Sequence, residues 1–296
     1  MGTKMNVMFK KTVATNMRKK LIITMSLVAL IISLIITAFY NGLVVRKYIV
    51  RTGKLERDQQ VRIVLIADLH SHVYGKNQSH IADLIKRQKP DIIALAGDIA
   101  DDVEPIKGVE LFLKALQDIA PIYYVTGNHE VWSGKVDEIK KLFRIYGAIV
   151  LENSFESVMV NGVELIIGGV DDPDIVHYEN KKYNYDWHKA VYNKFSTLRD
   201  VSAYKILISH RPELIDLYKT LPVDLVLSGH SHGGQVRIPF LLNGLYAPDQ
   251  GWFPKYAGGM YSHNELIHIV SRGVSYNPRL PRIFNPPEVV VIEISG

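Results

Sequence analysis

Five short apolar runs recur along most of this 296-residue chain. Amphipathic stretches of helical length lie between several of them. Buried strands that alternate with helices are typical of an α/β protein, because strands covered on both faces need continuous apolar sequence. The sequence therefore predicts an α/β fold. The apolar runs are VRIVLIA (61–67), DIIALAG (91–97), IYYVTG (122–127), KILIS (205–209) and DLVLSG (224–229), and the amphipathic stretches are residues 78–88, 104–118, 133–145 and 213–219.

Further strand candidates come without a helix for each of them. Their presence predicts more than one sheet, or a mixed sheet with antiparallel parts. Residues 61–296 show no internal repeat, low-complexity tract or Pro/Gly-rich linker, so we expect them to form one domain. The additional candidates are ESVMVNG (156–162), VELIIGGV (163–170), ELIHIVSRG (265–273) and EVVVIEIS (288–295).

Polar side chains gather at the point where each of the five apolar runs ends. The runs lead into ADLH, GDIAD, GNHE, SHRPE and GHSH. Because the carboxyl ends of strands in an α/β sheet meet at one edge, where ligands bind, the five clusters predict a single site. In extended backbone, residues i and i+2 point the same way, so Asp68 with His70, and His230 with His232, can each aim two side chains at one small volume.

The residue types in these clusters are those of a metal site. The chain has no cysteine, which excludes disulfides and thiolate zinc sites. Imidazole, carboxylate and amide oxygen together suit divalent Mn, Fe or Zn better than Mg or Ca. Seven candidates exceed what one ion can use, so we expect two ions bridged by a carboxylate and a hydroxide. The candidate ligands are Asp68, His70, Asp98, Asn128, His210, His230 and His232.

The charge of the chain is unevenly placed. Residues 1–60 hold 11 Lys/Arg and 2 Asp/Glu, a net charge of +9, which leaves 24 and 28, or −4, for residues 61–296. A mildly acidic body is poorly suited to a phosphate backbone, because nucleic-acid binding depends on neutralising phosphates with Lys and Arg. The charge therefore argues against a nucleic-acid partner.

An apolar stretch near the N-terminus contains no charged residue from Leu21 to Tyr40. A helix of this length crosses a hydrocarbon core of roughly 30 Å, which predicts a transmembrane helix rather than a core helix or a cleaved signal peptide. We expect a basic tail over residues 1–20, a membrane anchor over 21–43, and a juxtamembrane linker or a first short strand over 44–60. Slightly more basic residues precede the span than follow it. This favours a single-pass protein of the cell membrane, with a cytoplasmic N-terminus and an extracytoplasmic body.

The motifs at the strand ends resemble those of the calcineurin-like metallophosphoesterases, over essentially all of residues 61–296. The resemblance implies a four-layer αββα sandwich, in which helices flank two mixed β-sheets. It also implies two metal ions bridged by Asp98. The motifs are Asp68-x-His70, Gly97-Asp98-x-x-Asp101, Gly127-Asn128-His129-Glu130, His210 and Gly229-His230-x-His232.

By the same resemblance, each metal ion has its own set of ligands. Asp68, His70 and His232 would hold one ion, while Asn128, His210 and His230 would hold the other. The one departure from the commonest pattern is Glu130, where Asp is more usual, at a position that need not touch metal.

The metal ions and His129 suggest a hydrolytic mechanism. Metal coordination lowers the pKa of bound water from about 15.7 to near 7, so we expect a bridging hydroxide to attack phosphorus. Asn128 is better placed than its neighbour to coordinate, which leaves His129 to protonate the leaving oxygen. The resemblance implies that Asp101 orients His129 through its other ring nitrogen; the alternative is a helix N-cap carboxylate that faces solvent.

The stretch GHSHGGQ and the later SRG (271–273) are similar in particular to a membrane-anchored bacterial branch of phosphodiesterases. That similarity implies a phosphodiester or pyrophosphate substrate in the envelope, such as a UDP-diacylglucosamine-type glycolipid. We expect Mn to restore activity before Mg. The aromatic segment 240–261 would line the site or dip toward the bilayer, or else pack on the sheet as a long loop. The alternatives are a nuclease or nucleotide phosphodiesterase of the same family and a non-catalytic metal-binding module; protein partners are not predicted.

Overall fold

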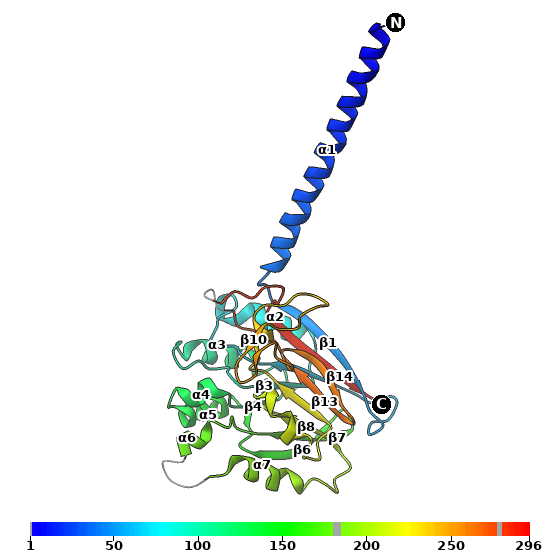
Figure 1. The fold of residues 1–296 in the computed structure, drawn as a ribbon. Coiled ribbons are helices and arrows are strands. Elements are labelled where there is room, and N and C mark those ends of the chain that lie inside the picture. The colour runs from blue at the N-terminus through cyan, green and yellow to red at the C-terminus, as the bar shows by residue number, and fades with distance from the viewer. Residues whose placement is uncertain (1, 180–184, 277–279) are drawn as a thin grey trace. The chain divides into compact units, whose positions relative to one another are not determined.

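The computed structural model describes residues 2–179, 185–276 and 280–296. The chain divides into two units, Met1–Tyr40 and Asn41–Gly296. The first unit contains helix α1 (Gly2–Ala38) (Figure 1). Its stretch Asn16–Ala38 has a mean hydropathy of 2.7 and is long and apolar enough to cross a membrane, properties that an N-terminal signal sequence shares.

The second unit is built on two mixed sheets of six strands each. In the first sheet, β14 runs antiparallel to β2, and the other neighbouring strands are parallel. The strands of this sheet, in spatial order, are β1 (Val44–Arg51), β14 (Glu288–Ser295), β2 (Gln60–Ile66), β3 (Ile92–Ala96), β4 (Ile122–Val125) and β5 (Ile149–Val150).

The second sheet has antiparallel strands at both edges and parallel strands between them. A small separate ribbon, β10 (Tyr246–Ala247) with β11 (Gly251–Trp252), follows β9 in the chain. The strands of the second sheet, in spatial order, are β12 (Gly259–His263), β13 (Leu266–Val270), β9 (Leu225–Ser228), β8 (Tyr204–Ile208), β7 (Val163–Gly169) and β6 (Ser154–Val160).

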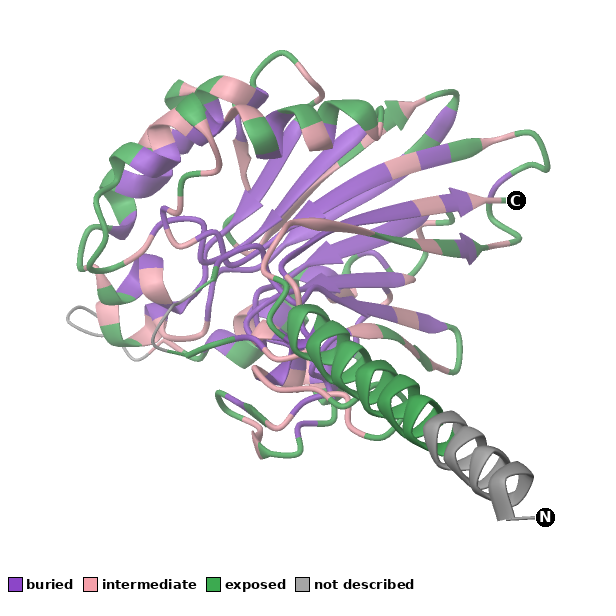
Figure 2. Cartoon of the chain, turned by 90° about the horizontal axis from the view of Figure 1, so that it is seen from above, coloured by how far each residue is buried: buried purple, intermediate pink, exposed green. Residues whose placement is uncertain are grey.

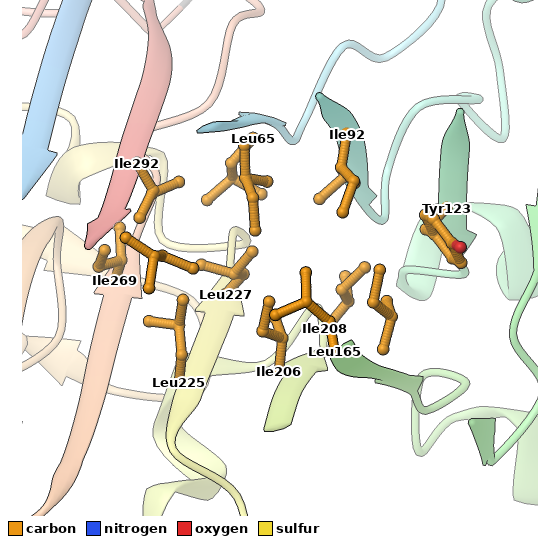
Figure 3. Packing of buried hydrophobic residues seen from close by; sticks show 14 of the residues in the cluster. Leu65, Ile92, Tyr123, Leu165, Ile206, Ile208, Leu225, Leu227, Ile269 and Ile292 are labelled. Atoms are coloured by element: carbon orange, nitrogen blue, oxygen red, sulfur yellow. The ribbon is translucent and has the colours of Figure 1, made fainter. Parts of the chain in front are cut away.

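The two large sheets face each other across an apolar core. Leu65 of the first sheet packs in this core with Ile206 and Leu227 of the second (Figure 3). Because successive side chains of a strand point to opposite faces, Val64 and Ile66 belong instead to a different core on the outer face of the first sheet. The continuous apolar runs of the sequence therefore cover both faces of each central strand.

Helices cover the outer face of each sheet. Residues of α2, α3 and α5 pack against the first sheet, and residues of α7 and α8 pack against the second. Figure 2 shows buried strands and, beside them, helices whose outer surfaces are exposed. The predicted sandwich of two mixed sheets flanked by helices is confirmed. The helices of this unit are α2 (Ser79–Arg87), α3 (Lys107–Leu116), α4 (Asn128–Trp132), α5 (Val136–Ile145), α6 (Ile175–Glu179), α7 (Trp187–Ser196) and α8 (Ile215–Tyr218), with 3-10 turns at Lys76–Gln78, Pro212–Leu214 and His232–Gly234.

The segment 44–60 is not a linker throughout, because its first part is a strand of the sheet. All eight residues of β1 pair in register with β14, from Val44 with Glu288 to Arg51 with Ser295. β14 is almost entirely buried and apolar, so its second edge requires a strand to satisfy its backbone groups. β1 is the edge strand, with exposed Arg46 and Lys47, and its polar composition is the reason that it resembles a linker in the sequence.

Candidate metal centre

The seven predicted ligands all lie just beyond the ends of β2, β3, β4, β8 and β9. Five of them have a left-handed backbone, with φ between 46° and 70°. Non-glycine residues rarely adopt this conformation, which costs roughly 1–3 kcal/mol and is concentrated at functional sites. The sharp turns bring the side chains back over the strand ends. The five left-handed residues are Asp68, His70, Asp98, His230 and His232.

Asp68, His70 and His232 form the first group of potential ligands, with suitable atoms all within 4.8 Å of one another. The Nε2 atom of His232 lies 3.5 Å from Asp68 Oδ1 and 3.3 Å from His70 Nε2. Asp68 is completely buried, and the backbone N–H of His230 donates to its carboxylate. This is the set of side chains that the resemblance assigns to one ion.

Asp98, His210 and His230 form the second group, and Asp98 also reaches the first. The Oδ2 atom of Asp98 lies 3.1 Å from His210 Nε2 and 3.7 Å from His70 Nε2. The Nε2 atom of His210 in turn lies 3.1 Å from His230 Nδ1. A carboxylate between two groups of nitrogen and oxygen ligands has the position that a bridging ligand requires.

The residues present fit divalent cations. Asn128 Oδ1 is buried and has no hydrogen-bond partner among the described residues, which costs roughly 1–3 kcal/mol unless a cation binds the oxygen. The closest ring nitrogens of His210 and His230 lie 3.1 Å apart, and those of His70 and His232 lie 3.3 Å apart, so potential nitrogen ligands converge in pairs. Nitrogen ligands combined with carboxylate and amide oxygens suit Mn, Fe or Zn.

The electrostatics of the site are also those of a cation site. Burial lowers the pKa of His210, but the negative charge of Asp98 outweighs it and raises the pKa to about 10. Burial likewise opposes ionisation of Asp98, but the charge of His210 holds the pKa of this carboxyl well below its usual range. The carboxylates thus attract positive charge to the place where the ligand atoms converge. Burial lowers the pKa of His230 to about 4, so this ring is neutral at pH 7.

Hydrogen bonds orient the rings of the candidate ligands. His210 donates from Nδ1 to the Ala96 carbonyl over 2.8 Å, which turns Nε2 toward Asp98. His70 Nδ1 lies 2.9 Å from Asp101 Oδ2, and His230 Nε2 lies 2.9 Å from Asp249 Oδ2. Such partners fix the orientation and the tautomer of a metal-binding histidine. Asp249 did not emerge from the sequence because it lies in the turn between β10 and β11, outside the strand-end motifs.

His129 lies beside the site, but its closest partner is not the one expected. Its Nδ1 atom is 2.6 Å from Asp102 Oδ1 and 3.5 Å from Asp101 Oδ2, and its Nε2 atom is 4.0 Å from Asp98 Oδ2. The other oxygen of Asp101 accepts the backbone N–H groups of Val103 and Glu104 over 2.9 Å. Asp101 therefore bonds primarily to His70, and Asp102 to His129. Two adjacent aspartates cannot be told apart by spacing alone.

Glu130 is buried and does not face the ligand cluster, but it holds two of the loops that form it. Its oxygens accept the backbone N–H groups of Asp98, Ile99, Ala100 and Gly127 over 2.7–2.9 Å. Burial raises its pKa to about 7, while the N–H donors favour the charged form. Glu130 thus joins the loop after β3 to the start of α4.

Arg211 is a further buried residue of the site that the sequence did not identify. Its guanidinium donates to Asp172 over 2.6 and 3.0 Å and to Asp174 over 3.1 Å, and it also bonds to Asp249. Its Nη1 atom lies 3.3 Å from His230 Nε2. The sequence feature that could have identified Arg211 is its position directly after His210 in the strand-end motif SHRPE.

Similarities to known proteins agree with this geometry. The family model described as calcineurin-like phosphoesterase matches residues 61–234, which include all seven candidate ligands. An uncharacterized metallophosphoesterase of Aquifex aeolicus is 31% identical over 261 residues, covering 85% of this chain and 92% of the relative. Another, from Campylobacter jejuni, is 29% identical over 305 residues, covering 98% of this chain and 74% of the relative.

A solved structure of similar fold is the NAD nucleotidase (NadN) of Haemophilus influenzae. It superposes with a TM-score of 0.51 at 16% sequence identity. The match covers 77% of this chain and 49% of the nucleotidase. At this identity the likeness concerns the fold and not the substrate.

Proposed function

Because the chain belongs to the calcineurin-like phosphoesterase family and is a metal-dependent phosphoric ester hydrolase, we propose that it hydrolyses phosphodiester or pyrophosphate bonds with two metal ions. The observation that carries the proposal is the position of Asp98, whose carboxylate lies between the two groups of ligands. Asp68, His70 and His232 would hold one ion, and Asn128, His210 and His230 the other. Bound divalent cations would supply an acidified water and positive charge for the phosphoryl oxygens.

We further propose that His129 donates a proton to the leaving oxygen. Its Nδ1 atom lies 2.6 Å from Asp102 Oδ1, a contact that orients the ring. Its Nε2 atom is 4.0 Å from Asp98 Oδ2 and therefore lies at the edge of the ligand cluster. Asp101 acts through His70, whose ring it orients. This arrangement separates proton transfer from metal binding.

The proposed substrate is a phosphoester of the cell envelope, such as a UDP-diacylglucosamine-type glycolipid. Helix α1 is long and apolar enough to anchor the chain in a membrane, and the domain beyond it carries a net negative charge. Both features favour a lipid-linked substrate over a polynucleotide. With α1 as a single membrane span, we place the catalytic domain outside the cytoplasm.

The test is hydrolysis by the purified full chain, with bis-p-nitrophenyl phosphate and then a UDP-linked glycolipid as substrates. Chelation should abolish activity, and Mn should restore it before Mg. Asp98→Ala should lose both metal and activity. His129→Ala should keep both metals and lose about 10² to 10⁴-fold in rate, because only general acid catalysis is removed.

Asp118→Ala, which removes an exposed carboxylate before β4, whereas Asn128 and His129 follow the other end of that strand, is the matched control and should remain active. Metal content measured by atomic emission separates the roles. A metal-free His129→Ala protein would mean that His129 is a ligand, and a fully active Asp98→Ala protein would refute the dinuclear site. Cleavage of plasmid DNA in preference to the glycolipid would redirect the substrate assignment to a nuclease.

A further inference from the structure

Residues 238–253, which we call the aromatic loop, carry an unusual amount of exposed apolar surface. Phe240 is fully exposed, Leu241 is 85% exposed, and Trp252 and Phe253 are about two-thirds exposed, at 66% and 67%. The loop contains a single charged residue, Asp249. Contiguous exposed apolar side chains mark interaction sites in soluble domains, because contact with water is unfavourable.

The aromatic loop is held in a defined shape and has not collapsed onto the sheet. Ile238 and Leu242 form a backbone bridge that places Phe240 at the tip of a tight turn. Tyr246 pairs with Trp252 in the β10–β11 ribbon, with their ring centroids 5.4 Å apart. Phe240 and Phe253 have left-handed backbones, with φ of 68° and 56°. Bulky residues in this conformation are strained, which is typical of functional segments.

The base of the aromatic loop lies at the end of the domain where β1 begins. Val236 forms a bridge with Ile283, and the Val44 N–H donates to the Pro287 carbonyl over 2.9 Å. The chain reaches Val44 directly from α1, which ends at Ala38. The connecting residues span at most about 18 Å when extended. If α1 crosses a bilayer, this short connection therefore keeps the start of β1, and with it the base of the aromatic loop, within reach of the bilayer.

We propose that the aromatic loop is a membrane-docking surface, which inserts Phe240, Leu241, Trp252 and Phe253 into the headgroup region of the bilayer. The inference rests on the proposed anchoring by α1. Trp and Tyr favour this interface, because their rings are apolar and their N–H or O–H groups remain hydrated. An amphipathic surface without a permanent anchor binds bilayers weakly, but a tether makes the contact intramolecular and so raises its effective concentration.

The same loop also contacts residues of the candidate metal centre. Asp249, at the turn of the ribbon, is bonded to His230 and Arg211. The next residue, Gln250, donates to the Ser231 hydroxyl over 3.2 Å. The docked loop would therefore place the candidate metal centre close to the depth of the lipid headgroups. The substrate class that fits this position is a phosphoester within a lipid headgroup.

The experiment uses the full chain reconstituted into vesicles of phosphatidylethanolamine and phosphatidylglycerol. Part of the phospholipid is brominated in the upper acyl chain, because bromine quenches a nearby tryptophan on contact. The chain has 3 Trp residues, of which Trp187 is buried and Trp132 and Trp252 are exposed. We expect brominated vesicles to quench part of the emission. Trp252→Phe should remove the quenched part, and Trp132→Phe should leave it unchanged.

A second pair of variants tests insertion without altering tryptophan. Phe240→Ser combined with Leu241→Ser should reduce the quenching of Trp252, whereas Met159→Ser, which alters an exposed apolar residue of β6, should not. Flotation of the vesicles reports anchoring by α1 independently. A chain that floats with the vesicles while Trp252 is unquenched overturns docking and leaves the anchor intact. A chain that does not float overturns both the docking and the anchor. If contacts between copies of the chain protect the aromatic loop from bromine, the surface is assigned to a second copy instead.

Discussion

Glu130 illustrates how a residue outside the ligand set maintains the site. Its carboxylate accepts four backbone N–H groups, three from the loop that contains Asp98 and one from Gly127. Water cannot replace Glu130 as the acceptor for these N–H groups, since the segment is buried. A Cβ atom at Gly127 would lie 2.3 Å from Asp98 Oδ1, so the two loops approach as closely as glycine allows. The position of Asp98 thus depends on Glu130.

We predict that Glu130→Gln lowers the free energy of unfolding by about 2–4 kcal/mol. The amide nitrogen of Gln cannot accept the N–H groups that one carboxylate oxygen accepts, and each unpaired buried N–H costs about 1–3 kcal/mol. Urea unfolding of the full chain in detergent measures the effect. Glu138→Gln, at an exposed position of α5, is the control and should change stability by less than about 0.5 kcal/mol. Equal stability of the two variants would contradict the role given to Glu130.

At the level of elements, strand β1 determines where the folded domain begins. β14 lies between β1 and β2, and its sequence EVVVIEIS is buried at nearly every position. Without β1, the edge of this apolar strand would be open to pairing with another chain. Val50 of β1 also belongs to the core between the two sheets. The compact unit accordingly begins at Asn41, and not at the later apolar run VRIVLIA (61–67).

We predict that a fragment of residues 41–296 is monomeric and unfolds cooperatively, whereas a fragment of residues 61–296 aggregates. The difference arises from the exposed edge of β14 in the shorter fragment. Size-exclusion chromatography and thermal unfolding followed by circular dichroism compare the two. A shorter fragment that is monomeric and equally stable would show that β1 contributes little to the domain.

At the scale of the whole domain, the candidate metal centre draws its residues from both sheets. Asp68, Asp98 and Asn128 follow strands of the first sheet, whereas His210 and His230 follow strands of the second. Ions bound there would stabilise the packing of one sheet on the other, because binding to the native state alone shifts the folding equilibrium.

We therefore predict that removal of metal lowers the stability of the domain. At a free Mn concentration about one hundred times the dissociation constant, one bound ion contributes about 2.7 kcal/mol. The melting temperature of the 41–296 fragment should fall with chelator and recover with Mn. Asp98→Ala should show a much smaller response, because it lacks the bridging ligand. Identical melting curves for the wild-type fragment with chelator and with Mn would refute the link between metal and folding.

Much of this organisation was predictable because it depends on local patterns. The continuous apolar runs predicted central strands, and the polar residues after them predicted one site, since strand ends converge in any such sheet. Asp68, His70, Asp98, His210, His230 and His232 fall into two adjoining groups of potential ligands, and Asn128 follows the end of β4.

Other features were decided only by the tertiary structure. Whether Asp101 or Asp102 bonds to His129 depends on a turn geometry that adjacent identical residues do not reveal. Asp249 reaches His230 across a loop whose path is set by packing rather than by periodicity. β1 is a strand because β14 offers it an edge, although 244 residues separate Val44 from its partner Glu288. Sequence patterns report the environment that a residue prefers, while the identity of its distant partner depends on the closed fold.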